Sequence, residues 1–195
     1  MAALLSTVQS LPDDERVAFE RALVPLARLA LVGRLAGDAA HDTGNALFGL
    51  VGLVDLLQEG EPLVRERIEL LHRSSAELQA MIVPLLELSR AADGRDTADL
   101  AAAADRAVAL ARRGRFVPAG PFPVACPPEL VLQAVLQLVL AAGADAQLEL
   151  VEGSLHVLPT DEPSLDELVA RRIAVDHGGS LERRGESLVL RLPPV

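Results

Sequence analysis

Two long amphipathic stretches separated by a short turn constrain the fold of this 195-residue chain more than any other feature. Residues 26–57 carry apolar side chains at steps of three and four, as at Leu31 and Leu35, and residues 63–90 repeat the pattern. This period is typical of helices with one apolar face. Gly and Pro within 58–62 predict a turn between them. The sequence therefore predicts an antiparallel helical hairpin, and two copies are expected to cover their apolar stripes as a homodimeric four-helix bundle.

The segment before the hairpin, residues 1–24, is predicted to be a helical extension. Leu11-Pro12-Asp13 is typical of a helix start, because proline and acidic residues suit the first turn. The sequence predicts a short helix from there to about Ala22. Pro25 predicts a break or a new helix start, since proline disrupts a helix interior. The hairpin is accordingly placed at residues 25–93.

After a predicted linker at 91–96, the pattern changes to short apolar runs bounded by Gly and Pro. Helices are expected at 100–113, 128–142 and 164–177. Strands are expected at 116–117, 123–125, 147–152, 155–158, 180–183 and 187–192. The fold class is therefore α plus α/β: a helical hairpin followed by an α/β sandwich at residues 96–195.

Charge and composition exclude several function classes. The net charge is −10, which disfavours nucleic acid and anionic membrane surfaces as partners. All 18 basic residues are Arg, which excludes a catalytic or Schiff-base lysine. The sequence contains neither a run of 18 apolar residues nor a basic leader, so a membrane span and a secretory signal are not expected. Cys126 is the single cysteine, and the four histidines lack metal-ligand spacing. We expect a cytoplasmic protein without a metal of its own.

The segment around His41 resembles the phosphoacceptor box of sensor histidine kinases: a histidine, an acid (Asp42), two further residues and an asparagine (Asn45). Three later segments resemble that family's ATP-binding domain in the same order. They are 132–138, like the start of the asparagine-containing helix, 171–181, like the closing helix and strand, and 188–193, like the last strand. The resemblance covers residues 25–195 and implies a dimerisation and histidine-phosphotransfer hairpin before a kinase-type ATPase domain.

The second half departs from this family where nucleotide would bind. The magnesium-binding asparagine falls on Ala141 or Ala142, the preceding asparagine on Gln137, and the expected glycines on Ser164 and Asp166. Phosphates need backbone amides presented by glycines, and Mg²⁺ needs oxygen ligands. The ATP-binding domain is therefore expected to be degenerate and to hold no cofactor. The chain as a whole resembles the kinase-derived histidine phosphotransferases of phosphorelays.

The candidate catalytic residues are His41, Asp42 and Asn45. Neutral imidazole is a good nucleophile near neutral pH, and the adjacent Asp42 could take the ring proton as general base. Asn45, one helical turn on, could contact phosphate or an attacking water. The resemblance implies as partner a response-regulator receiver domain, or a hybrid histidine kinase that carries one, with Mg²⁺ supplied by the receiver. Two alternatives stay open: a non-catalytic pseudokinase scaffold, and a response-regulator phosphatase that uses Asn45.

Overall fold

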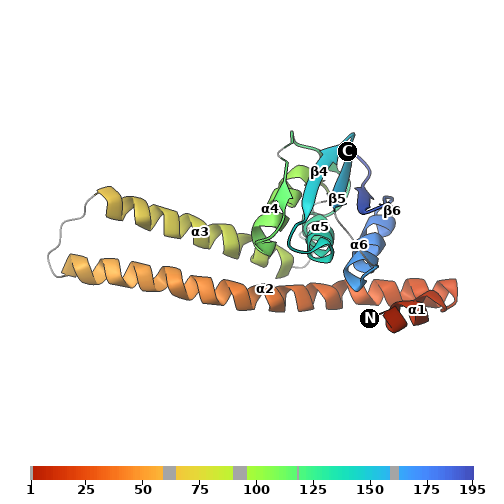
Figure 1. Ribbon diagram of the computed structural model, residues 1–195, viewed down its shortest axis with the longest axis horizontal. Helices are drawn as coiled ribbons and strands as arrows, with labels where there is room; N and C mark the ends of the chain where they lie inside the picture. The colour runs from red at the N-terminus through yellow and green to blue at the C-terminus, as the bar shows by residue number, and fades with distance from the viewer. Residues whose placement is uncertain (1, 59–64, 90–95, 118, 159–162) are drawn as a thin grey trace.

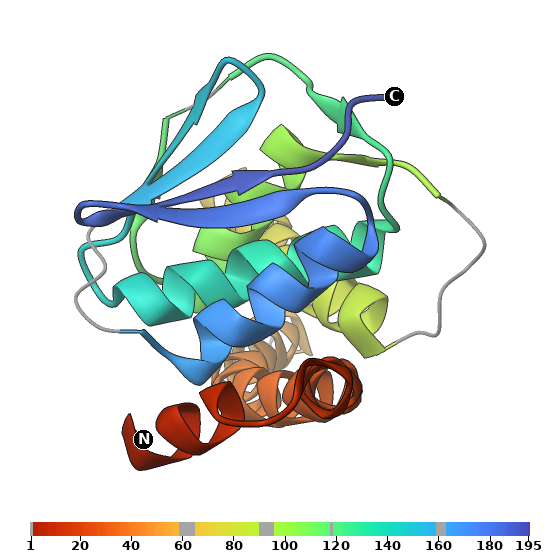
Figure 2. The ribbon, with the colours of Figure 1, turned by 90° about the vertical axis from the view of Figure 1, so that its right-hand side faces the viewer.

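The computed structural model describes residues 2–58, 65–89, 96–117, 119–158 and 163–195. A long helical hairpin projects from a smaller α/β part (Figure 1). Viewed along the long helix, the α/β part has a sheet on one side and helices beneath it, and the long helix lies under those helices (Figure 2). The combination of helices and sheets confirms the mixed α and β class.

The helices are α1 (Ala2–Gln9), α2 (Asp13–Gln58), α3 (Arg65–Ser89), α4 (Leu100–Ala111), α5 (Pro128–Ala142) and α6 (Leu165–Asp176). The strands are β1 (Ala98–Asp99), β2 (Arg115–Phe116), β3 (Pro123–Val124), β4 (Gln147–Val151), β5 (Ser154–Leu158), β6 (Ser180–Arg184) and β7 (Ser187–Arg191). The main sheet has the order β2-β4-β5-β7-β6, parallel only between β2 and β4, and β1 pairs with β3 separately. Every strand except β1, which was not predicted, lies within two residues of its predicted bounds.

The prediction of a break at Pro25 is wrong, because α2 runs through it without interruption. A proline inside a helix removes one hydrogen bond and costs about 3 kcal/mol. Contacts with the α/β part on both sides of Pro25 offset that cost. Arg21 pairs with Asp176 at 2.9 Å, and Arg28 Nε donates to Gln133 Oε1 at 3.0 Å. The boundary predicted at residue 24 thus falls inside one helix.

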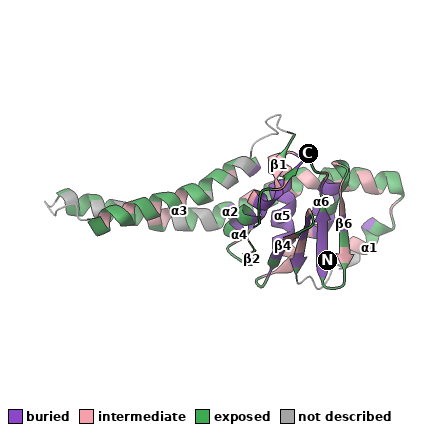
Figure 3. Ribbon diagram, turned by 90° about the horizontal axis from the view of Figure 1, so that it is seen from above, coloured by how far each residue is buried: buried purple, intermediate pink, exposed green. Residues whose placement is uncertain are grey.

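One hydrophobic core joins the hairpin to the α/β part. Leu31 and Leu35 of α2 and Leu88 of α3 are buried in the same cluster as the apolar faces of α4, α5 and α6. Burial coloured on the ribbon shows the contrast: the α/β part has a buried interior, and the outer hairpin is largely exposed (Figure 3). The base of the hairpin therefore belongs to the core of the α/β part.

Leu88→Ala should lower the free energy of unfolding by about 2–5 kcal/mol, because the removed side chain is fully buried at this junction. We expect a single cooperative urea transition, monitored by circular dichroism, whose midpoint shifts to lower urea concentration in the variant. Leu29→Ala is the control: Leu29 is 70% exposed on α2, so its loss should change stability by less than about 0.5 kcal/mol. Two separate transitions, with only one displaced, would contradict the shared core.

Candidate functional site

The structure places His41 and Asn45 on the surface of α2, one helical turn apart and both exposed. Asp42 belongs to the same helix, and the position of its side chain lies outside the described part of the structure. Among the described residues, none forms a hydrogen bond with the His41 ring. An exposed imidazole on a rigid helix is accessible to a second protein, and the amide of Asn45 lies on a neighbouring part of the same face.

Small residues surround His41 on α2. A methyl group added at Gly37 or at Gly44 would meet nothing within 4 Å, and the same holds for Gly33, Gly49 and Gly52. Glycine lowers helix stability by about 1 kcal/mol relative to alanine. These glycines therefore destabilise α2, and no close packing against another described residue explains them. Because Gly37 and Gly44 carry no side chains, the backbone of another molecule could approach the His41 imidazole closely from these positions.

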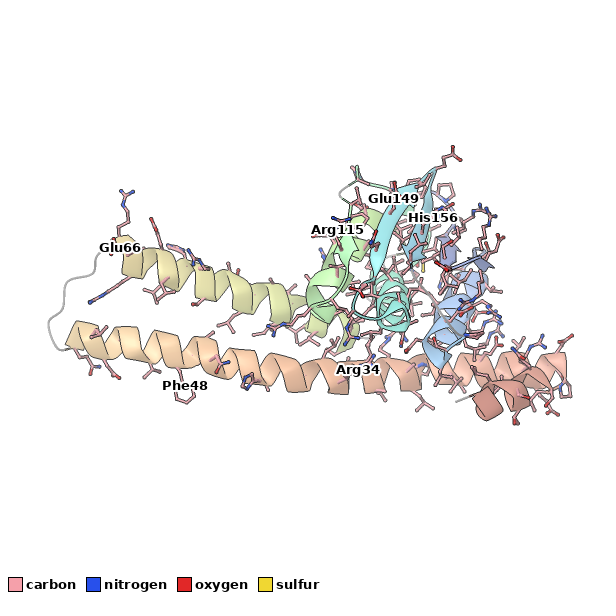
Figure 4. All side chains as sticks on the ribbon, in the orientation of Figure 1. Arg34, Phe48, Glu66, Arg115, Glu149 and His156 are labelled. Atoms are coloured by element: carbon pink, nitrogen blue, oxygen red, sulfur yellow. The ribbon has the colours of Figure 1, made fainter. Side chains whose placement is uncertain are left out.

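The outer half of α2 also carries exposed apolar side chains. Leu47, Val51 and Val54 are each at least half exposed, and Phe48 is 79% exposed. Figure 4 shows Phe48 pointing away from the hairpin partner α3. A helix that is apolar on more than one face is normally covered on all of them. These four side chains, on the same helix as His41, form a bare apolar face in the single chain.

Polar contacts hold α2 against the α/β part, away from His41. Gln133 of α5 is fully buried, and its Nε2 donates to the Val24 carbonyl oxygen at 2.8 Å while its Oε1 accepts from Arg28. Asp176 of α6 accepts from Arg21 and Arg172. Burial raises the pKa of Asp176, but the two guanidinium hydrogen bonds outweigh it, and the net shift is downward. These contacts fix where α6 and α5 sit on α2.

The region predicted to be a degenerate nucleotide site lies where α2, α5 and α6 meet. Gln137 is buried, Ser164 caps α6 by accepting from the Glu167 amide at 3.1 Å, and Asp166 follows in the first turn. Residues 159–162, which precede Ser164 in the chain, lie outside the described residues. Ala27 and Leu31 of α2 line a cavity on this face, together with Gln137 and Asp166. Sequence reasoning missed this cavity, although two glutamines four residues apart in the apolar α5 are a signal for it.

The remaining titratable residues that the structure describes do not assemble into a second centre. His72 is exposed on α3, and His177 caps the C-terminus of α6, with Nδ1 at 2.9 Å from the Ile173 carbonyl oxygen. Cys126 is fully buried, and burial, with the nearby Glu129 carboxylate, raises the pKa of its thiol to about 12. Among the described residues, no three His, Cys, Asp or Glu side chains are close enough to hold a metal ion.

No described helix is both long enough and apolar enough to cross a membrane. No family model matches the chain, and no curated protein matches it.

Proposed function

We propose that this chain is a histidine phosphotransfer protein of a two-component phosphorelay, which passes a phosphoryl group between His41 and the aspartate of a receiver domain without binding ATP. The observation that carries the proposal is the exposed His41–Asn45 pair on a helix face of small residues. A receiver domain must bring its phospho-aspartate within bonding distance of the imidazole. An exposed imidazole with Gly37 and Gly44 one turn away on either side suits that approach, whereas a structural histidine is usually packed or hydrogen-bonded.

The proposed transfer needs little from this chain beyond a positioned nucleophile. An unprotonated nitrogen of His41 attacks the phosphorus of the receiver's aspartyl phosphate, a P–N bond forms, and the P–O bond to the aspartate breaks with its electron pair returning to the carboxylate. The proton on the other ring nitrogen passes to Asp42. Mg²⁺ held by the receiver neutralises the phosphoryl oxygens, and Asn45 donates its amide hydrogens to them.

In this proposal the hairpin of α2 and α3 is the dimerisation and phosphotransfer unit, and the α/β part is a degenerate kinase-type ATPase domain. The order of elements from α4 to β7 is the one that the resemblance implies, which supports this assignment. The α/β part is packed on α2 through buried side chains, as at Gln133. An ATPase domain that phosphorylates a histidine on the hairpin must move toward that histidine. Because the α/β part is packed on α2, we infer that it supports the hairpin instead.

The homodimer predicted by the hairpin is testable through its bare apolar face. Replacing Phe48 and Val51 together by Glu should convert a dimer into a monomer, because carboxylates at the centre of an apolar interface lose their hydration. Light scattering after size-exclusion chromatography measures the mass. Gln58→Glu, an exposed polar position at the end of α2, is the matched control and should remain dimeric. A wild-type chain that is monomeric at high micromolar concentration contradicts the four-helix bundle.

The function itself is tested by mixing the chain with a receiver domain carrying a labelled phosphoryl group. Acid-labile label should appear on the chain within minutes, and Mg-ATP alone should give none. Loss of the receiver's label without transfer supports the phosphatase alternative, in which Asn45 places a water against the phospho-aspartate. Stable binding without any change in label supports the scaffold alternative.

A further inference from the structure

A cavity of about 270 Å³ lies between α2, α5 and α6, some way along α2 from His41. Its walls are mostly apolar, from Ala27, Ala30 and Leu31 of α2 and from Leu165 and Val169 of α6. Three polar side chains reach it, Gln137, Asp166 and Arg34. Figure 4 shows Arg34 on the stretch of α2 that runs alongside the α/β part. The volume is slightly below the roughly 300–1,000 Å³ of most ligand sites, so only a small organic molecule would fit.

Gln137 is the informative residue, because it is 2% exposed and its Oε1 has no hydrogen-bond partner. A buried acceptor left without a donor costs about 1–3 kcal/mol. The contrast with Gln133, one turn earlier on α5, is direct: both polar ends of Gln133 are bonded by α2. At the cavity α2 contributes Ala27, Ala30, Leu31 and the exposed Arg34, and none of them donates a hydrogen bond to the Gln137 oxygen.

The charges at the cavity favour a ligand that donates hydrogen bonds. Asp166 is half-buried at its edge, and burial raises the pKa of its carboxyl group, an effect that the Arg34 guanidinium partly opposes. Arg34 is exposed, and no hydrogen bond joins it to Asp166 or Gln137 in the described structure. The two polar groups that are at least partly buried at the cavity, the Gln137 oxygen and the Asp166 carboxylate, accept hydrogen bonds, whereas the Arg34 donor is exposed. An anionic or acceptor-only ligand would leave them unpaired.

We propose that this cavity binds a small organic cation of the amidine or primary amine type, with its donor group between Gln137 Oε1 and the Asp166 carboxylate. Its apolar body would lie against Ala30, Leu31 and Val169. Such a ligand touches α2 on one side and α5 and α6 on the other, so its binding stabilises the packing of the α/β part on the hairpin. The site gives the chain an input for a chemical signal that is separate from His41.

Three compounds of the same shape test the chemistry: benzamidine, benzamide and benzoate. Titration calorimetry and ligand-observed NMR with the full chain should detect benzamidine most strongly, benzamide more weakly and benzoate not at all, since only the first two donate hydrogen bonds. Gln137→Leu should weaken benzamidine by about tenfold, the loss of one buried hydrogen bond. Because the readout is binding, a failure here is distinguishable from a failure of the phosphotransfer proposal.

Two alanine positions supply the steric control. Ala30→Leu adds bulk at the wall of the cavity and should weaken benzamidine binding, whereas Ala36→Leu, at an exposed position of α2 that does not line the cavity, should leave the affinity unchanged. If Ala30→Leu does not fold by circular dichroism, Gln137→Leu decides alone. Equal affinities for benzamidine and benzoate, or affinities that neither Gln137→Leu nor Ala30→Leu changes, overturn the proposal. So does the absence of binding at millimolar concentrations, which would leave the cavity to water.

Discussion

His41→Ala should abolish receiver-dependent labelling of the chain, to below about one thousandth of the wild-type rate. The imidazole is the nucleophile in the proposed reaction, and no other residue replaces a missing nucleophile at that position. The substitution is at an exposed helical position and introduces a better helix former, so the fold should be retained. Circular dichroism and the oligomeric mass check this, and the initial rate of acid-labile label measures the loss.

His72→Ala is the matched control, because His72 is also an exposed histidine of the hairpin, on α3. It should transfer at the wild-type rate. Asn45→Ala should retain transfer but at a rate lowered by about tenfold, as expected from one hydrogen bond to phosphate. Labelling that persists in His41→Ala and disappears in His72→Ala would move the site to the other helix. Receiver dephosphorylation that survives His41→Ala and is lost in Asn45→Ala would favour the phosphatase alternative.

Gly179→Ala should destabilise the chain by about 3 kcal/mol or more, a larger effect than most single substitutions produce. A methyl group at Gly179 would lie 2.1 Å from the carbonyl oxygen of Arg191 and 3.2 Å from that of Ala174. Both contacts are with backbone, which cannot rotate away as a side chain can. The Gly179 amide also donates to the Ala174 oxygen at 2.8 Å, so the chain is held at this point where α6 passes into β6.

Urea denaturation followed by circular dichroism measures the effect, and Gly185→Ala is the comparison. Gly185 has a φ of +61°, but a methyl group there meets nothing within 4 Å. Its substitution should therefore cost about 1–2 kcal/mol from backbone strain alone. A stability of Gly179→Ala within 1 kcal/mol of wild type would show that β7 can shift away from this turn.

Much of the local structure followed from particular residues. The three- and four-residue steps of leucines predicted α2 and α3, and the helix expected at 164–177 does begin at Ser164, the N-cap, whose side chain accepts from the Glu167 amide. Gly and Pro between short apolar runs predicted the strands other than β1. These signals are readable because caps, turns and periodicity depend on neighbours within a few residues. His41, Asp42 and Asn45 were singled out by the resemblance to the phosphoacceptor box of sensor histidine kinases.

The sequence by itself determined most of the elements and their order, with β1 not predicted, and the residues that share a helix face with His41. Only the tertiary structure decided that α2 passes through Pro25, that Leu88 joins the core of the α/β part, and that Gln137 faces a cavity. Each of these depends on what a distant segment places opposite the residue. Contacts of Arg21 and Arg28 with α6 and α5 offset the free-energy cost of Pro25 in the helix. The residues of α2 at the cavity donate no hydrogen bond to the Gln137 oxygen, which is left unpaired. Periodicity states which face is apolar, but the partner of that face is set by packing between parts of the chain more than a hundred residues apart.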